Sequence, residues 1–447
     1  MGTPSPRTVF TSLQRIASLA REAPSLAFTS IHHVIDLDLL QEAYRRTRKD
    51  GAVGVDGQTA EDYEADREGN LRSLLDRLKL GTYHAPPVRR VYIPKGDGSK
   101  TRPIGIPTFE DKVLQRAVAL VLEAIYEQDF LDCSYGFRPG RSAHQALESV
   151  FQAMMRMQGG YVIELDIEKF FDRLDHGQLR RFLDQRVRDG VLRRAIDKWL
   201  QAGVLEEGEL SHPRSGTPQG GVISPLLANV YLHEVLDRWF TEQIVPRLRG
   251  KAFLARFADD AILVFSREED ARRVLEVLPR RFARFGLTLH PEKTRLVRFT
   301  CPPYERGERL PPRDGGPGTF DFLGFTHYWD KSRKGRWVVR KKTANDRLRR
   351  TLKRTADWCR RNRHREVSWQ HLRLVQAIRG HDAYYAITGN GRQLSRLRYA
   401  VMRIWRQWLS RRSGSRHMAW DRFNRLLARY PLPPVRIVHL AARAANP

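Results

Sequence analysis

Phe253-Leu-Ala-Arg-Phe-Ala-Asp-Asp-Ala-Ile-Leu-Val-Phe265 is the stretch of sequence that decides the fold. Two apolar runs, 253–257 and 261–265, flank Ala258-Asp-Asp260, and this pattern predicts a β-hairpin with an acidic turn. Adjacent carboxylates at such a turn repel each other and lose hydration, unless a cation favours their charged form. For this pair alone, the alternative remains that aspartate simply favours turns.

A third carboxylate follows another apolar run upstream. Tyr161-Val-Ile-Glu-Leu165 predicts a buried strand, and Asp166 comes directly after it. Carboxylate oxygens at rigid strand ends suit Mg²⁺, so Asp166 could complete a two-metal site with Asp259 and Asp260. Two such metals stabilise the attacking and leaving oxygens of an in-line displacement.

Working outward, apolar periodicity and turn residues predict alternating helices, hairpins and loops. The expected helices cover much of 8–80 and then 110–130, 142–157, 176–188, 191–202, 224–240 and 268–285. A hairpin is expected at 88–106, a strand at 295–299, loops at 134–142 and 216–221, and a surface loop or boundary at 302–318.

Seven short motifs follow one another in a specific order. They are Ile93-Pro-Lys-Gly-Asp-Gly-Ser-Lys-Thr-Arg-Pro-Ile-Gly-Ile-Pro107, Ser134-Tyr-Gly-Phe-Arg-Pro-Gly-Arg-Ser142, Glu164-Leu-Asp-Ile-Glu-Lys-Phe-Phe-Asp172, Gly216-Thr-Pro-Gln-Gly-Gly-Val-Ile-Ser-Pro225, Arg256-Phe-Ala-Asp-Asp260, His290-Pro-Glu-Lys-Thr294 and Phe322-Leu-Gly-Phe325. With them, the chain resembles the reverse transcriptases and maturases encoded by bacterial group II introns, over roughly residues 30–440.

The resemblance implies roles for the residues that match these motifs. Asp166, Asp259 and Asp260 would bind two Mg²⁺ ions, for which Mn²⁺ could substitute, with the carbonyl of Ile167 as a further ligand. Phe171 would be the steric gate, because a ring beneath the sugar leaves no room for a 2′-hydroxyl. Ordinary core packing beside Phe170 is the alternative for Phe171.

Further residues of the motifs would contact the incoming dNTP. Lys95 and Arg102, on the 88–106 hairpin, would hold its β and γ phosphates by charge-assisted contacts. Gln219 would pack against the nucleotide, and Lys293 would lie near the phosphates as a possible proton donor to pyrophosphate.

Two motifs leave questions open. Arg138 and Arg141 are candidates for contact with the template backbone, with structural salt bridges as an equal alternative. The family usually has Tyr where this chain has Phe257; the lost hydroxyl predicts altered fidelity or no change, not loss of catalysis.

Basic residues are concentrated at one end of the chain. The net charge is +28, and residues 331–447 hold 31 Lys and Arg against 5 Asp and Glu, which is +26 of that total. Such segregation favours a nucleic-acid surface. The resemblance places thumb and maturase functions in this region, and the residues expected to contact RNA are Lys341, Lys342, Arg349 and Arg350.

The sequence therefore predicts an α+β right-hand polymerase with fingers in 1–160, palm in 161–330 and an all-helical basic thumb and maturase region in 331–447. It would extend a DNA primer on an RNA template, and promote intron splicing and retrohoming. A host-adopted enzyme in DNA repair or phage defence, or primarily a splicing factor, is the alternative. No apolar run suggests a membrane span or secretory signal. We expect a cytoplasmic protein, nucleoid-associated when it acts on DNA, without the endonuclease domain of some relatives.

Overall fold

The computed structural model describes residues 6–95, 100–206, 209–211, 216, 220–302, 318–412 and 418–439. It has a mixed α/β fold with two compact units. The first contains Met1–Ala143, Leu165–Leu263 and Glu269–Arg295, and the second contains His144–Glu164, Val264–Glu268 and Leu296–Pro447. The chain therefore passes between the units several times.

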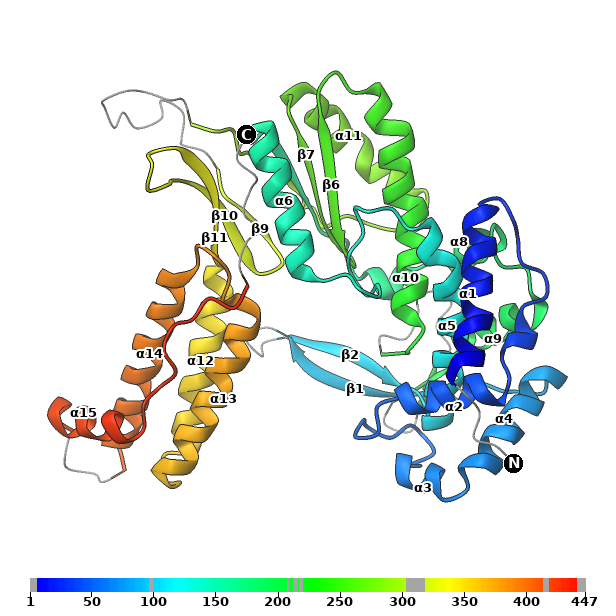
Figure 1. Cartoon of the computed structure of the whole chain (residues 1–447), viewed down its shortest axis with the longest axis horizontal. Coiled ribbons are helices and arrows are strands. Elements are labelled where there is room, and N and C mark those ends of the chain that lie inside the picture. Colours follow the sequence, from blue (N-terminus) through cyan, green and yellow to red (C-terminus); the bar gives the residue numbers. More distant parts are fainter. Residues whose placement is uncertain are drawn as a thin grey trace. The chain divides into compact units, whose positions relative to one another are not determined.

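The first unit is built around one long buried helix, α5 (Phe109–Asp129) (Figure 1). Thr108 caps it by accepting a hydrogen bond from the Asp111 amide, and residues on several sides of the helix are buried. Helices α1 (Pro6–Glu22) and α2 (Leu37–Arg46) pack against α5. The short helices η1 (His32–Val34) and α3 (Ala60–Ala65) and the longer helix α4 (Arg67–Leu80) complete this N-terminal part.

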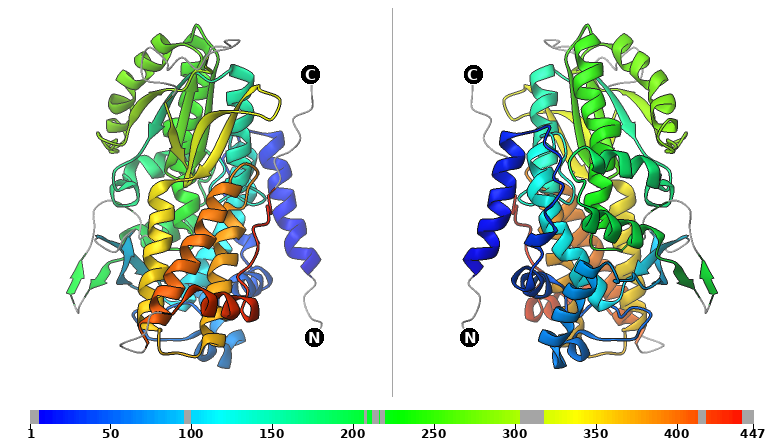
Figure 2. Two further views of the ribbon diagram at one scale, coloured as in Figure 1. Left: turned by 90° about the vertical axis from the view of Figure 1, so that its left-hand side faces the viewer. Right: turned by 90° about the vertical axis from the view of Figure 1, so that its right-hand side faces the viewer.

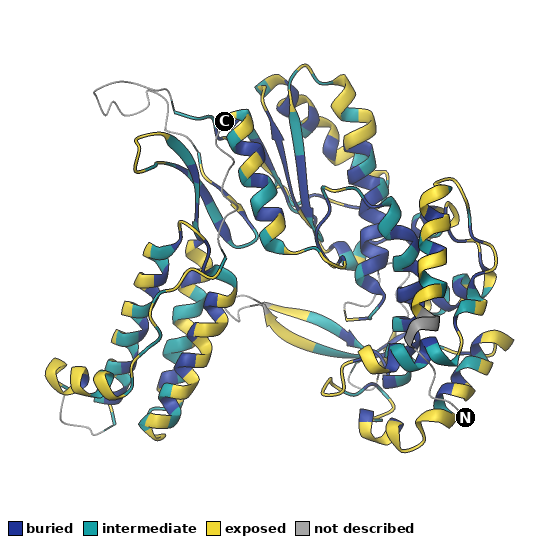
Figure 3. Cartoon of the chain, in the orientation of Figure 1, coloured by how far each residue is buried: buried dark blue, intermediate teal, exposed yellow. Residues whose placement is uncertain are grey.

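The predicted hairpin at 88–106 is confirmed. Strands β1 (Val88–Lys95) and β2 (Lys100–Ile106) pair antiparallel, from Arg89 opposite Ile106 to Lys95 opposite Lys100. Two short strands that the sequence did not predict, β4 (Val204–Glu206) and β5 (Glu209–Ser211), extend this sheet to the order β2-β1-β4-β5. Much of the hairpin surface is exposed in Figure 3.

A second four-stranded sheet has the order β6-β7-β3-β8. Its strands are β3 (Tyr161–Leu165), β6 (Ala252–Phe257), β7 (Asp260–Phe265) and β8 (Arg295–Arg298), so the hairpin predicted at 253–265 is confirmed. Helix α6 (Ala143–Met157) precedes β3. Helices α7 (Phe170–Arg173), α8 (His176–Asp184) and α9 (Gly190–Gln201) lie between β3 and β6 along the chain, and α11 (Glu268–Ala283) lies between β7 and β8. The long helix predicted from residue 224 is α10 (Ser224–Leu232), which continues as a π-helix, η2 (His233–Ile244), and a single turn, η3 (Val245–Arg247).

The second unit has a three-stranded antiparallel sheet and a helical bundle. The strands, in the order β11-β10-β9, are β9 (Phe320–Phe322), β10 (Phe325–Lys331) and β11 (Trp337–Thr343). The bundle comprises α12 (Asn345–Arg361), α13 (Val367–Tyr385), α14 (Gly391–Ser410) and α15 (Trp420–Arg429), and α12 packs against α14 (Figure 2). Its core is formed by side chains that include Leu348, Cys359, Leu374, Trp405 and Phe423.

The prediction that 331–447 is all-helical is wrong at β11. This strand pairs along its whole length with β10, and the side chains of Val339, Lys341 and Thr343 are buried on one face. Lys341 was expected to contact RNA; instead it lies on the buried face of a strand whose burial follows a period of two. No helix in the described ranges is long and apolar enough to cross a membrane.

Candidate active site

The acidic turn lies at the tip of the β6–β7 hairpin. Ala258 has a left-handed backbone with φ of +58°, and it is followed by Asp259, which is half-buried, and Asp260, which is exposed. A non-glycine residue rarely adopts this conformation, and where it occurs the surrounding structure must hold it. The turn is therefore a constrained one that fixes where the two carboxylates leave the hairpin.

Asp166 reaches the same edge of the sheet. Strand β3 is the neighbour of β7. The Cα of Gly160, just before β3, lies so close to the Phe265 carbonyl oxygen that a Cβ there would collide with it. Because the start of β3 thus lies beside the end of β7, the two strands run antiparallel, and the end of β3 lies beside the start of β7. That arrangement brings Asp166 to the edge that carries Asp259 and Asp260.

A basic residue from a third segment neutralises Asp166. Lys293 Nζ donates to Asp166 Oδ2 at 3.0 Å. The backbone of Asp166 is also held, because its carbonyl accepts a hydrogen bond from the amide of His290 at 2.8 Å. Ile167 is buried and forms an isolated antiparallel bridge with Leu289. The His290–Thr294 motif thus lies alongside the residues that end β3.

The carboxylates fit a divalent cation by their chemistry and their common edge. Among the described residues, no three His, Cys, Asp or Glu side chains are close enough together to form a ready ligand set. Carboxylates without a cation between them repel one another. The ammonium of Lys293 shows that this edge accommodates positive charge against Asp166.

Phe171 lies next to the loop at 216–221. It belongs to α7, is half-buried, and makes an edge-to-face contact with Phe170 at 5.3 Å between ring centroids. A Cβ on Gly216 would lie 2.7 Å from the Phe171 carbonyl oxygen, and Gly216 has a φ of +91°. Only glycine fits such a close approach in that conformation. The expected gate and the expected nucleotide loop are therefore in direct contact.

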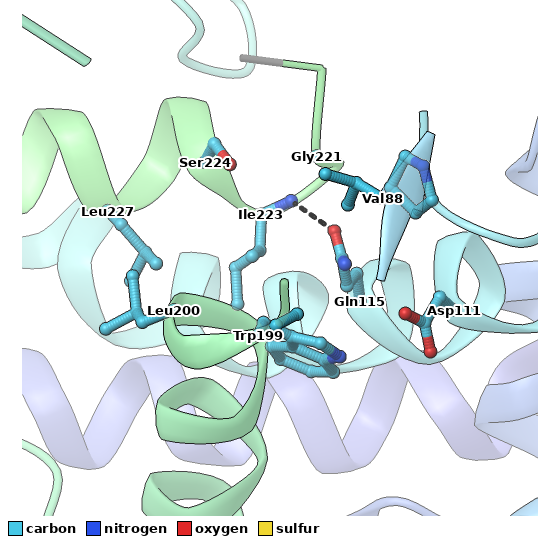
Figure 4. Close-up of a pocket in the computed structure, with 11 residues that line it drawn as sticks. Val88, Asp111, Gln115, Trp199, Leu200, Gly221, Ile223, Ser224 and Leu227 are labelled. Atoms are coloured by element: carbon cyan, nitrogen blue, oxygen red, sulfur yellow. Dashed lines mark hydrogen bonds between the residues drawn. The ribbon is translucent and has the colours of Figure 1, made fainter. Parts of the chain in front are cut away.

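The far end of this loop is anchored inside the first unit. Gln115 Oε1 of α5 accepts a hydrogen bond from the Val222 amide at 2.8 Å. It also accepts a longer one from the Ile223 amide at 3.4 Å, which Figure 4 shows as a dashed line. Gly220 lies directly against the Gly105 carbonyl of β2. Gln219 itself falls outside the described residues. The loop is thus tied to α7, to α5 and to the β1–β2 hairpin.

Figure 4 also shows a small cavity beside this anchor, which Asp111 and Trp199 help to line. Tyr83 donates a short hydrogen bond to Asp111 Oδ1 and accepts one from Trp199 Nε1 at 2.8 Å. Burial raises the pKa of Asp111 to about 7, against the opposing effect of the Tyr83 hydrogen bond.

The basic residues expected on the hairpin lie on its two strands. Arg102 is exposed on β2 opposite Ile93, so its side chain is available to a ligand. Lys95 ends β1 opposite Lys100, and its side chain lies outside the described part of the chain. The structure therefore gives the strand position of both residues, and the side-chain exposure of Arg102 alone.

Of the two arginines expected to contact template, Arg138 is a structural residue. Its guanidinium is buried, is paired with Glu127 at 3.0 Å, and donates to the carbonyls of Leu131 and Ser134. Arg141 is partly exposed and pairs with Asp132 at 2.5 Å. The structural alternative thus holds for Arg138, whereas Arg141 stays a candidate.

The expected RNA contacts of the second unit divide in the same way. Lys341 is buried, and its Nζ donates to the Leu147 carbonyl at 3.3 Å, so its assignment to a surface contact is wrong. Arg349 is exposed on α12, Arg350 is half-buried and ion-paired with Asp346, and Lys342 lies over the Tyr328 ring. These three stay candidates.

One residue beside the site was not singled out from the sequence. Arg256 of β6 is fully buried and forms a bidentate ion pair with Asp237 at 2.6 and 2.8 Å. Burial opposes its charge, but the Asp237 carboxylate outweighs burial and raises the pKa of Arg256 above its ordinary value. The signal in the sequence for a structural role of Arg256 was its position inside an otherwise apolar predicted strand.

The family model described as reverse transcriptase (RNA-dependent DNA polymerase) matches residues 93–327. That range contains the three aspartates, the Gly216–Gly221 loop and both of the basic residues expected on the β1–β2 hairpin.

Of three similar proteins, two are named after introns and the third has a name that states no function. The group II intron-encoded protein LtrA of Lactococcus lactis subsp. cremoris is 36% identical over 282 residues, which are 60% of this chain and 46% of that protein. Protein YkfC of Escherichia coli (strain K12) is 33% identical over 329 residues, 64% of this chain and 84% of that protein. An uncharacterized 91 kDa protein in the cob intron of Schizosaccharomyces pombe is 32% identical over 258 residues, 57% and 31% respectively. The chain thus spans about half of the Lactococcus protein and less of the yeast one.

Proposed function

This chain belongs to the reverse transcriptase (RNA-dependent DNA polymerase) family, and we propose that it extends a DNA primer on an RNA template as a group II intron-type enzyme. The observation that carries the proposal is that Asp166, directly after β3, lies at the same edge of the β6-β7-β3-β8 sheet as the turn with Asp259 and Asp260. The matched family range contains all three residues.

In the proposed reaction, the primer 3′-hydroxyl loses its proton to solvent and its oxygen attacks the α-phosphorus of a dNTP. The new P–O bond forms as the bond from the α-phosphorus to the oxygen of the β-phosphate breaks, and pyrophosphate leaves. The three aspartates would hold divalent cations, Mg²⁺ in the first instance. These cations would stabilise the negative charge on the attacking and leaving oxygens. Asp259 and Asp260 supply fixed negative charge at the hairpin tip. Asp166 supplies it from β3, and Lys293 holds its carboxylate in place.

Nucleotide selection would come from the Phe171 side chain and the loop that touches it. Phe171 would exclude a 2′-hydroxyl, and Gly216, which has no side chain and lies close to the Phe171 carbonyl, would hold the backbone there. Arg102 and Lys95 would bind the β and γ phosphates, and Gln219 would pack on the nucleotide. Lys293 would donate a proton to the departing pyrophosphate.

Binding of a structured intron RNA is the second part of the proposal. Residues 331–447 carry a net charge of +26, from 31 basic and 5 acidic residues. Polyanion binding follows from such a surface without any aspartate of the hairpin. The names of the Lactococcus and Schizosaccharomyces relatives refer to introns, which supports a role in splicing and retrohoming.

The domain names of a right-hand polymerase are part of the same proposal. We assign fingers to 1–160, palm to 161–330 and thumb with maturase region to 331–447. The β1–β2 hairpin supports the first assignment and the sheet with the acidic turn supports the second. The helical bundle α12–α15 supports the third.

Primer extension tests this function. The purified chain should incorporate dNTPs on an RNA template with Mg²⁺, lose activity in EDTA, and discriminate strongly against NTPs. Absence of Mg²⁺-dependent dNTP incorporation on RNA would overturn the polymerase proposal, whereas efficient NTP use would overturn only the role of Phe171.

A further inference from the structure

Arg256 forms a complete set of hydrogen bonds in a buried site behind the acidic turn. Nε and Nη2 bind the two carboxylate oxygens of Asp237, Nη2 also donates to Ser134 Oγ at 2.7 Å, and Nη1 donates to Asn229 Oδ1 at 2.9 Å. The remaining Nη1 hydrogen bond is to the Ala258 carbonyl at 3.0 Å. These acceptors satisfy all of the N–H donors that a guanidinium carries.

The hydrogen bond to Ala258 is the one that concerns the site. Its carbonyl belongs to the peptide that links Ala258 to Asp259, so the bond fixes the orientation of the peptide plane from which Asp259 leaves. Ala258 has a φ of +58°, a conformation that costs free energy and persists only where neighbours enforce it. Arg256 is one of the groups that enforce it.

The preceding peptide, which links Phe257 to Ala258, is held as well. Gly136 lies so close to the Ala258 nitrogen that a Cβ there would collide with it. Asn229 joins the two supports, because its Nδ2 donates to the Gly136 carbonyl at 2.7 Å while its Oδ1 accepts from Arg256. Residues 133–135 run beside β6, with the Arg256 amide donating to the Cys133 carbonyl at 2.8 Å. The turn is thus clamped between Arg256 and the Ser134–Ser142 loop.

Stability alone does not account for this arrangement. The ion pair between Arg256 and Asp237 is almost completely buried, with side-chain exposures of 1% and 0%. Such pairs are often no more stabilising than apolar residues of similar volume, because desolvation opposes the attraction between the charges. An apolar side chain at 256 would fill space equally well, but it would leave the Ala258 carbonyl without this donor.

We propose that Arg256 is a positioning residue for the Asp259–Asp260 pair. Its hydrogen bond to the Ala258 carbonyl sets the direction in which these side chains leave the turn. The inference rests on the proposed function and adds a residue to it. Arg256 touches no substrate; it acts by setting the geometry in which Asp259 meets a divalent cation and the nucleotide.

The test compares Arg256→Lys with Arg186→Lys in the full chain. Arg186 is a matched control, because it is equally internal, pairs with Asp129 at 2.9 Å and donates to the carbonyls of Ala20, Ala23, Pro24 and Leu26, away from the acidic turn. Lysine keeps the charge in both variants but cannot reproduce a planar fork of donors. Both variants should therefore lose thermal stability.

Only Arg256→Lys should change the chemistry. We expect kcat for dNTP addition to fall about tenfold to a hundredfold, because a misplaced catalytic group loses rate out of proportion to its shift. The Kd for primer–template should stay unchanged, the Mg²⁺ concentration for half-maximal activity should rise, and Mn²⁺ binding measured by electron paramagnetic resonance should weaken. Arg186→Lys should leave all four unchanged.

Ser134→Ala provides a milder variant in case Arg256→Lys does not fold. It removes one acceptor of Arg256 and should shift kcat and Mn²⁺ affinity in the same direction by a smaller factor. A folded Arg256→Lys, or failing that Ser134→Ala, that retains wild-type kcat and Mn²⁺ affinity would overturn the positioning role, as would equal changes in Arg186→Lys. If the unmodified chain adds no dNTP, the proposed function fails, and the Mn²⁺ measurement still tests Arg256.

Discussion

At the scale of single residues, the acidic turn places charge where folding alone would not favour it. Asp259 and Asp260 are adjacent, and Asp259 is half-buried. Like charges at such a distance raise the free energy of the folded chain unless a cation lies between them. Function and stability therefore make opposite demands on these two side chains.

Asp259→Asn separates these demands. Primer extension should fall by about a thousandfold or more, because metal-assisted charge stabilisation contributes several kcal/mol and each ~1.4 kcal/mol is tenfold. The Tm, measured on the same preparation, reports separately whether the variant stays folded. Intron splicing, measured on the same preparation, should persist. Loss of splicing in a protein with an unchanged Tm would show that RNA binding depends on the turn.

Phe171→Ala tests the gate. Removing the ring should open space for a 2′-hydroxyl and raise the relative kcat/KM for NTP over dNTP by about tenfold to two hundredfold, the range of steric discrimination in apolar pockets. Single-nucleotide incorporation with matched dNTP and NTP measures this ratio. Arg138→Lys, a substitution at a buried structural residue, serves as the control and should leave the ratio unchanged. An unchanged ratio in Phe171→Ala would assign Phe171 to core packing.

Asp111 predicts an unusual pH dependence of stability. Burial raises its pKa in the folded chain from 3.8 to about 7, aided by Glu110 and Asp56 and opposed by Tyr83 and Arg77. Between these pH values the folded state binds more protons than the unfolded state, so the free energy of unfolding should decrease as pH rises from about 4 to about 7.

The decrease should be on the order of 4 kcal/mol, at about 1.4 kcal/mol for each unit of pKa difference. Urea unfolding across this pH range measures it. Asp111→Asn, which is neutral and still accepts from Tyr83, should remove this component of the pH dependence. The same slope in the variant would mean that another group titrates.

At the scale of elements, the Gly216–Gly221 loop contacts both helix α5 and the backbone of Phe171. Gln115 of α5 accepts hydrogen bonds from two successive amides at the end of the loop, and the start of the loop touches Phe171. Helix α5 and the backbone of Phe171 thus contact opposite ends of this loop.

Gln115→Leu should disturb the loop. The half-buried Val222 amide and the buried Ile223 amide would lose their acceptor, which costs about 1 to 3 kcal/mol, and dNTP discrimination should decrease with it. Gln152→Leu is the matched control, because Gln152 is an exposed helical glutamine that donates to Glu148 at 3.3 Å. Urea unfolding and nucleotide competition measure the two effects. Equal stability of the two variants would contradict the anchor.

The elements that the sequence predicted well are those with uniform patterns. Both hairpins, the long helix at 224 and the helices α5 and α11 follow from apolar periodicity and turn residues. Strand β11 was missed because Lys341 is buried against Leu147, a residue nearly two hundred positions away in sequence. The roles of Arg138 and Arg256 were hidden for the same reason: whether an arginine is a surface contact or an internal support depends on which carbonyls tertiary folding brings to it.

At the scale of the whole molecule, charge is segregated along the chain. Residues 331–447 contribute +26 of the net +28. Counterion release makes binding of a polyanion by such a region strongly dependent on salt.

Arg349→Ala combined with Arg354→Ala tests this region. Both residues are exposed on α12. A plot of the logarithm of the RNA association constant against the logarithm of salt concentration has a negative slope. This slope should become less steep by about 0.7 to 0.9 for each RNA phosphate that is no longer neutralised, without a change in Tm. Filter binding of intron RNA over a salt series measures the slope. The control is Arg72→Ala, which removes an exposed arginine in the first unit, paired with Glu68 at 2.5 Å, and should leave the slope unchanged.

The repeated passage of the chain between the units has a consequence for cutting and recombining the gene. The second unit includes 144–164 and 264–268 as well as the C-terminal segment. Within it, the Val339 amide donates to Met155 Sδ at 3.4 Å and Lys341 binds Leu147, so β11 depends on a helix encoded far upstream. A fragment starting at residue 331 would lack that support and should be degraded in cells. Exchange of RNA specificity between relatives would then require transplanting two separated stretches together, and crossovers at a single site would yield unstable hybrids.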